Sequence, residues 1–265
     1  NIARWVPFEM DKLEIEDRLC NKMIRPTSIP LTREDLLIEQ ALCREALRLS
    51  LNHHAALATD LRGVSSRQSI KSMLSSGESN SSTLLDMKDI DLVIGSGGVL
   101  SHSPQRQGTI MMLLDSFEPL GFTELAVDSV FMMPHLGVLS SILPEAAVEI
   151  FEHDCLVLLG TTFSPVVNNN ALGKDCISVS INGGKEEIIA SGDIKVFTAE
   201  PHTKLTATIR PMSGKTDLGN GFGKEVIQEV DAGLCGFIVD CRPRPIVVSN
   251  KDILRKWFSS LGVSI

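Results

Sequence analysis

Asp91-Leu-Val-Ile-Gly-Ser-Gly-Gly-Val-Leu-Ser101 is the most informative stretch of the sequence, because a short apolar run opens directly into a glycine-dense turn. Residues 92–94 predict a buried β-strand. Gly95, Gly97 and Gly98 let the backbone adopt positive φ and approach a ligand without a Cβ atom in the way. A phosphate or ribose can then meet backbone N–H groups where a helix begins. Turns of this composition also often do no more than join a strand to a helix.

The segments on both sides of this turn extend the pattern. Ser103 and Pro104 predict the N-cap and first position of a helix that runs through residues 110–114. A strand is expected at 124–127, followed by helices at 134–142 and 144–151. The alternation of strand and helix favours a sheet with helices on its faces. Upstream, Thr32 predicts the N-cap of a long helix that reaches His53-His54.

Three regions follow from these patterns, and together they predict an α/β protein. Residues 1–84 are expected to be mainly helical, with a serine-rich loop at 65–82. Residues 85–153 form the α/β core. Residues 154–265 are expected to form a β-rich module, with a closing helix at 251–261 and strands at 155–159, 176–181, 187–190, 205–209, 225–230 and 233–239.

Composition and charge exclude several classes of protein. The 265 residues are 43% hydrophobic and 22% charged, which is typical of a globular chain with a full core. The net charge of −8 and the lack of a basic cluster argue against a nucleic-acid partner. No apolar run reaches the length of about 20 residues that spans a bilayer, so we expect no membrane partner and a cytoplasmic location. The six scattered cysteines are expected to be buried free thiols.

Other candidate sites give weaker signals. Gly219-Asn-Gly-Phe-Gly-Lys224 resembles a phosphate loop, but Glu225 stands where Ser or Thr is required, so a turn between strands is expected. The six histidines lack metal-ligand spacing, and no metal site is predicted. Catalytic groups that meet only in space cannot be read from spacing.

Polar residues beside the glycine turn are a further candidate site, because the ends of parallel strands converge at ligand crevices. They are Ser101, His102, Arg106 and Asp128. A helix cap, a surface arginine and a loop aspartate are the alternative interpretations. The paired methionines at 111–112 and 132–133 fit core positions, and they also fit a protein-docking surface.

Two levels of resemblance follow from these residues. Residues 93–101 resemble the adenosine motif of the actin, sugar-kinase and Hsp70 ATPase superfamily. Nearly the whole chain resembles the MutL family of glutamate mutase accessory proteins, which includes the reactivating factor of D-ornithine aminomutase and is unrelated to mismatch-repair MutL. The matching stretches begin with Glu16-Asp-Arg-Leu-Cys-Asn-Lys-Met-Ile-Arg-Pro26 and include residues 91–104, 125–139 and 210–224.

The resemblance implies an actin-like, ribonuclease H-like ATPase lobe. It also implies an ATP-dependent factor that exchanges damaged cobalamin for adenosylcobalamin in an aminomutase of the glutamate or ornithine type. Nucleotide contacts carry over to Gly95, Ser96, Gly97, Gly98 and Ser101, with ATP or ADP and Mg²⁺ as cofactors. The Asp-x-Gly-Ser/Thr-Thr phosphate motif is absent, so we expect this chain to be the C-terminal part of a longer protein with incomplete hydrolysis machinery.

Cobalamin itself is expected to stay with the partner enzyme, because the base-off motif Asp-x-His-x-x-Gly is absent and His135-Leu-Gly137 lacks its spacing. Two other functions remain open. One is a small-molecule kinase of the same superfamily, and the other is a non-catalytic assembly protein with a methionine-rich docking face. A homo-oligomer is compatible with each of them.

Overall fold

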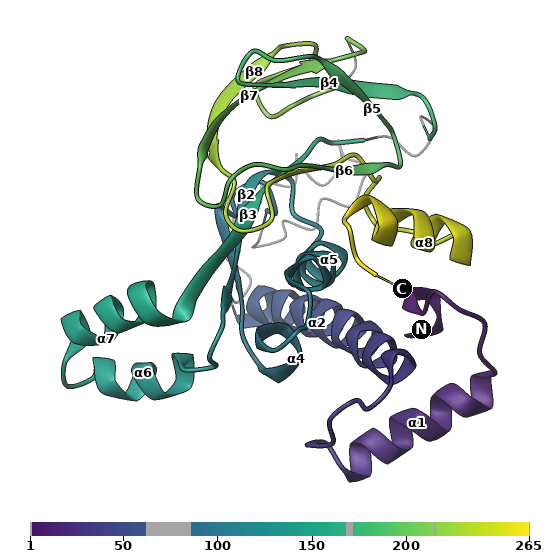
Figure 1. The fold of residues 1–265 in the computed structure, drawn as a ribbon, viewed down its shortest axis with the longest axis vertical. Helices are drawn as coiled ribbons and strands as arrows, with labels where there is room; N and C mark the ends of the chain where they lie inside the picture. Colours follow the sequence, from purple (N-terminus) through teal and green to yellow (C-terminus); the bar gives the residue numbers. More distant parts are fainter. Residues whose placement is uncertain (1, 62–85, 168–171, 215, 265) are drawn as a thin grey trace, which may run out of the picture.

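The computed structural model describes residues 2–61, 86–167, 172–214 and 216–264, and it combines helices with two β-sheets (Figure 1). The serine-rich stretch 65–82 lies outside the described residues. The chain is of mixed α and β structure, while the actin-like architecture stays a prediction.

A five-stranded sheet forms the centre of the molecule. Its strand order is β1 (Leu92–Gly95), β2 (Gly121–Asp128), β3 (Leu156–Ser164), β9 (Phe237–Asp240) and β6 (Ile194–Phe197). β1 and β2 are parallel, β2 and β3 are antiparallel, and β3 and β9 are parallel. The short helix α4 (Gly98–Ser101) and the helix α5 (Arg106–Phe117) connect β1 to β2. The strand, glycine turn and helix predicted from the sequence are therefore confirmed as a β-α-β unit. The expectation that residues 92–94 are buried is wrong, because β1 is an edge strand on which Leu92 is exposed and Val93 and Ile94 are half-buried.

The central sheet is covered on both faces (Figure 1). Helices α2 (Arg33–Leu61), α5 and α8 (Lys251–Ser260) cover one face. The other face packs on an antiparallel sheet of β5 (Glu187–Ala190), β4 (Asp175–Ile181), β7 (Lys204–Pro211) and β8 (Val226–Asp231). Side chains along β9 point alternately to the two faces of the sheet. Ile238 packs toward the helices, while Phe237 and Val239 pack toward the second sheet.

Helix starts follow their capping residues. Thr32 Oγ1 accepts a hydrogen bond from the Asp35 amide at 3.1 Å, and the Asp35 carboxylate accepts from the Thr32 amide at 3.2 Å. This reciprocal pair satisfies two amides at the start of α2, as in a capping box. Asp11 caps α1 (Lys12–Ile24) and Asn250 caps α8, each with a side-chain oxygen that accepts from one amide of the first turn. The N-cap predicted at Thr32 is confirmed.

Several boundaries differ from the predictions. α5 begins at Arg106 with Gln105 as its N-cap, because residues 98–101 form a separate helical turn and the Ser103 hydroxyl donates to the Gln105 carbonyl. The sequence did not predict β6, and the strand expected at 233–239 begins only at Phe237. Residues 233–236 form the turn before it.

The boundary expected at residue 154 is not a boundary between sheets. β3, β9 and β6 follow it in sequence, yet they extend the sheet that β1 and β2 begin. Only β4, β5, β7 and β8 form a sheet of their own. The correction has a physical reason: local composition changes at residue 154, but strand pairing joins segments that are far apart in the chain.

Candidate nucleotide turn and the hairpin it anchors

The glycine turn lies at the carboxyl end of β1 and presents open backbone. Gly97 has φ of +109° and is the N-cap of α4, and no side chain caps this helix. A Cβ atom placed on Gly97 or Gly98 would meet nothing within 4 Å. The two residues therefore leave space for a ligand against the main chain, which is the property that a nucleotide contact requires.

Gly95 and Ser101 have different surroundings from Gly97 and Gly98. Gly95 is buried, and a Cβ there would lie 3.1 Å from Leu100 and 3.3 Å from Leu113. Ser101 is also buried, and its hydroxyl donates to the Asp128 carbonyl at 2.5 Å. Of the five predicted nucleotide contacts, Gly95 and Ser101 are therefore on the buried side of the turn, where they support it rather than face a ligand.

Asp128 ends β2 and binds the turn from the neighbouring strand. Its carboxylate accepts hydrogen bonds from Ser96 Oγ at 3.1 Å, from the Met132 amide at 3.1 Å and from the Met133 amide at 2.9 Å. Burial opposes ionisation of Asp128, but the bonds from Met133, Met132 and Ser96 outweigh it and hold the pKa of this carboxyl below its ordinary value. The ends of the two parallel strands do converge, as predicted, and Asp128 links the turn to the chain that follows β2.

Arg106 completes this arrangement, since its guanidinium donates to the Ser101 carbonyl at 2.8 Å. His102 is exposed. Among the four polar residues that the sequence placed near the turn, Ser101, Arg106 and Asp128 are thus joined by hydrogen bonds. Each of the three has a structural role in holding the turn.

A helical hairpin projects from the base that Asp128 holds (Figure 1). We define the hairpin as residues 129–155, which include α6 (Met133–Ser140), α7 (Pro144–Ile150) and the π-helical turn η2 (Phe151–Cys155). α6 and α7 pack mainly on each other, burying Leu136 and Ala147 between them. Most other side chains of the two helices are exposed or half-buried. The sequence predicted both helices but gave no sign that they project.

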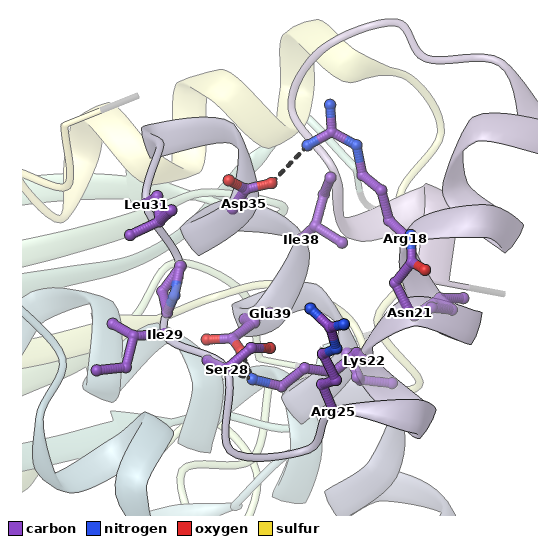
Figure 2. A pocket seen from close by; sticks show the side chains of 13 residues that line it. Arg18, Asn21, Lys22, Arg25, Ser28, Ile29, Leu31, Asp35, Ile38 and Glu39 are labelled. Atoms are coloured by element: carbon purple, nitrogen blue, oxygen red, sulfur yellow. Dashed lines mark hydrogen bonds and ion pairs between the residues drawn. The ribbon is translucent and has the colours of Figure 1, made fainter.

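A second candidate is a cavity of about 320 Å³ between α1 and α2 (Figure 2). Arg18, Lys22 and Arg25 line it together with apolar side chains such as Ile38. Arg18 pairs with Asp35 at 2.6 Å, and Lys22 pairs with Glu39. Because carboxylates of the same cavity neutralise two of its cations, its charge gives little attraction for a phosphate.

A buried ionic network, which the sequence did not predict, lies behind α5. The Asp115 carboxylate accepts from Arg44 Nε at 2.8 Å and from Arg242 Nη1 at 2.7 Å, and all three side chains are fully buried. Asp240 pairs with Arg242 and Arg244. Burial alone would raise the pKa of Asp240, but these two arginines lower it well below its ordinary value. The network joins α2, α5 and the end of β9, so its role is structural.

The structure around the remaining candidates from the sequence gives no sign of a ligand site in the described residues. Residues 219–224 lie in the loop between β7 and β8, where Asp217 accepts from the Gly219 and Gly221 amides. Within the described ranges, no three His, Cys, Asp or Glu side chains gather in a way that could hold a metal ion. The six cysteines are free thiols, but Cys20 is exposed and Cys43 and Cys235 are only partly buried, so the expectation that all are buried is wrong.

Comparison with known proteins identifies the family. A family model described as MutL protein matches residues 1–155, which include the glycine turn, Asp128 and the hairpin. The chain belongs to this family, the MutL type of glutamate mutase accessory proteins, which is distinct from mismatch-repair MutL. The family is associated with cobalamin-dependent mutases. No curated protein and no solved structure matches the chain.

In the part of the chain that the structure describes, no helix combines the length and the apolar character needed to cross a membrane.

Proposed function

We propose that this protein is an ATP-dependent reactivating factor for a cobalamin-dependent aminomutase of the glutamate or ornithine type. In this function it exchanges damaged cobalamin for adenosylcobalamin. Membership of the MutL family supports the class of partner. The observation that carries the nucleotide part of the proposal is the open backbone at Gly97 and Gly98, at the carboxyl end of β1.

The residues of the turn fit a nucleotide in part. Gly97 and Gly98 offer main chain free of side chains, and Ser96 offers a hydroxyl whose present acceptor is Asp128. Bound ATP would supply free energy for the exchange through hydrolysis by water to ADP and phosphate. The described residues do not supply a set of carboxylates for Mg²⁺, so no metal ligand is assigned to this chain.

A physical route connects such a turn to a partner. If ATP and ADP hold the turn differently, they bias any element that is linked to it by the difference in their binding free energies. Ser96 and the first amides of α6 share one acceptor, the Asp128 carboxylate. A nucleotide that recruits the Ser96 hydroxyl removes one of these bonds and thereby changes the anchoring of the hairpin.

Isothermal titration with ATP and with ADP, each with Mg²⁺, tests the nucleotide part. Gly98 suits substitution because its backbone is unstrained and its surroundings are open. Gly98→Asp places a negative charge against a phosphate, while Gly98→Asn adds the same bulk without the charge. A phosphate contact predicts that Asp weakens binding by at least about 10-fold relative to Asn. Equal loss in both variants indicates contact with the nucleoside, and no binding at millimolar nucleotide contradicts the proposal.

A reactivation assay tests the enzyme part of the proposal. A mutase inactivated with cyanocobalamin is incubated with this protein, adenosylcobalamin and either ATP or a non-hydrolysable analogue. Recovery of activity that requires ATP and fails with Gly98→Asp supports the proposal. Recovery that is the same without nucleotide contradicts it.

The exposed hairpin favours a second candidate, a non-catalytic assembly protein that binds the mutase. Met133, one of the methionines that the sequence linked to a docking surface, is 38% exposed, whereas Met111 and Met112 are fully buried in the core. Copurification with a mutase and reactivation that both persist unchanged in Gly98→Asp favour this function over the ATP-dependent one.

A further inference from the structure

We infer that the hairpin, residues 129–155, is the surface that docks on the mutase, and that its counterpart is an apolar groove bordered by Lys and Arg side chains. This inference rests on the proposed function and names the part of the chain that contacts the partner. It is carried by the exposure and the charge of the hairpin, which are independent of the nucleotide turn, and by the position of the hairpin.

Exposed apolar side chains are concentrated in the hairpin. Among the described residues, 24 large hydrophobic side chains are exposed, and eight of them lie within the 21 residues from 130 to 150. They are Val130, Phe131, Met133, Val138, Ile142, Leu143, Val148 and Ile150. Isolated apolar side chains on a surface are ordinary, but a contiguous group marks an interaction site.

The most exposed of these residues lie in α6 and in the turn that follows it. Val138 in α6 is 71% exposed, and Ile142, two residues after the end of α6, is 76% exposed. The Ile142 and Leu143 amides donate to the Leu139 carbonyl, so the chain continues the helical course past Ser140, and Val138 and Ile142 form one apolar ridge. α6 itself carries no Lys, Arg, Asp or Glu. A ridge of this kind fits the helix-in-groove mode of recognition, in which residues at i and i+4 enter an apolar groove.

The acidic residues of the hairpin indicate that the groove on the partner is bordered by basic side chains. The hairpin contains four acidic residues and no Lys or Arg. Glu145, Glu149 and Glu152 line one shallow hollow on α7, with Val148 between them. An apolar ridge beside a one-sided acidic face is complementary to an apolar groove with a basic rim. A second copy of this chain, with its net charge of −8, is the less favoured occupant.

The position of the hairpin agrees with this role. It projects from the body of the protein (Figure 1) and makes no extensive contact with the other described elements. Its first helix begins at the amides that Asp128 holds, next to the glycine turn. The docking surface is therefore attached to the element through which the proposed function couples nucleotide to partner.

Binding to immobilised glutamate mutase and, separately, to D-ornithine aminomutase, each loaded with cyanocobalamin, tests the inference. The full chain is compared with Val138→Glu/Ile142→Glu and with the uncharged Val138→Ser/Ile142→Ser. The matched control is Ile227→Glu/Val247→Glu, which alters side chains that are 62% and 67% exposed on β8 and in the loop after β9. Circular dichroism verifies that each variant is folded.

We expect the Val138/Ile142 Glu variant to weaken binding by about 100-fold, mainly through faster dissociation, and the Ser variant to weaken it by about 10-fold. The control stays within about 2-fold of the wild type. Reversal of the acidic face with Glu145→Lys/Glu149→Lys slows association by about 10-fold and reduces its dependence on salt. Glu200→Lys/Glu229→Lys, with the same net charge, does not.

Two results would overturn the inference while leaving the proposed function intact. In the first, the wild type binds a mutase and every hairpin variant binds it equally well. In the second, sedimentation velocity finds a dimer that the Val138/Ile142 variants dissociate, with mutase binding unchanged, so that the occupant is a second copy. A wild type that binds neither mutase would contradict both the inference and the proposed function.

Discussion

Helix α5 and the α6–α7 hairpin are both rich in apolar residues, but the structure encloses one and exposes the other. Every residue of α5 from Gly108 to Ser116 is buried, whereas α6 and α7 bury only Leu136 and Ala147. α5 is buried on all sides because the sheet, α2 and α8 surround it, and its one buried charge, Asp115, is paired with Arg44 and Arg242. The hairpin is also rich in apolar residues but lacks such neighbours, which agrees with the docking role that we propose for it.

The largest loss of stability is expected on removal of the buried charge of Asp115 on α5. Asp115→Asn removes the negative charge that Arg44 and Arg242 share, and it leaves two guanidinium groups buried without full compensation. We expect the free energy of unfolding to fall by about 3–5 kcal/mol, measured by urea denaturation. Asp252→Asn, which breaks the exposed pair with Arg255, serves as the control and costs at most about 1 kcal/mol. Equal effects would mean that the Asp115 network is not buried.

A matched pair of truncations compares the two regions directly. Leu113→Ala removes a fully buried side chain from α5, and Ile142→Ala removes a side chain that is 76% exposed in the turn after α6. We expect a loss of stability of about 2–5 kcal/mol for Leu113→Ala because it leaves a cavity. Ile142→Ala should change stability by less than about 0.5 kcal/mol. A large loss for Ile142→Ala would show that the hairpin packs against the body of the protein.

Substitutions at Gly97 and Gly98 are expected to differ in their effect on stability, because only Gly97 has a strained backbone conformation. Gly97→Ala places a side chain at φ of +109°, so stability should fall by about 1–3 kcal/mol. Gly98→Ala lies in open space with an ordinary φ and should leave stability within about 0.5 kcal/mol of the wild type. Thermal denaturation of both variants measures the difference. A similar loss for both would indicate that Gly98 is also needed for the fold.

The smallest effect is expected at Asp128, which links the glycine turn to the hairpin, and this effect depends on pH. The pKa of Asp128 is depressed in the folded protein, so the stability it contributes is complete above its ordinary value and is lost as pH falls through the folded pKa. Asp128→Asn should therefore cost about 1–2 kcal/mol at pH 7. The cost should shrink toward zero as the pH falls below about 4. Urea denaturation across this range measures it, and a cost that does not vary with pH would contradict the assignment.

Local patterns in the sequence predicted most of the elements around the turn. The apolar run at 92–94, the glycines after it and the cap at Thr32 are signals that lie within a few residues of the structures they specify. The strand predicted at 124–127 is part of β2, and the two hairpin helices lie close to their predicted ranges. These features depend on backbone geometry and periodicity, which a sequence displays directly.

The rest depends on contacts between distant residues. Arg44, Asp115 and Arg242 are spread over about 200 residues, and nothing in their spacing indicates that they meet. Strands on both sides of residue 154 pair in one sheet for the same reason. The burial of Ser101 and the projection of the hairpin also follow from tertiary packing, although the acidic, Lys- and Arg-free composition of residues 129–155 was visible in the sequence.

Hydrogen–deuterium exchange of the full chain with and without MgATP tests most directly whether nucleotide binds at the glycine turn and changes the anchoring of the hairpin through Ser96 and Asp128. We expect slower exchange in residues 95–101 and altered exchange in residues 129–136, with Ser96→Ala keeping the first change and losing the second. Unchanged exchange in both segments of the wild type at saturating MgATP would contradict this expectation.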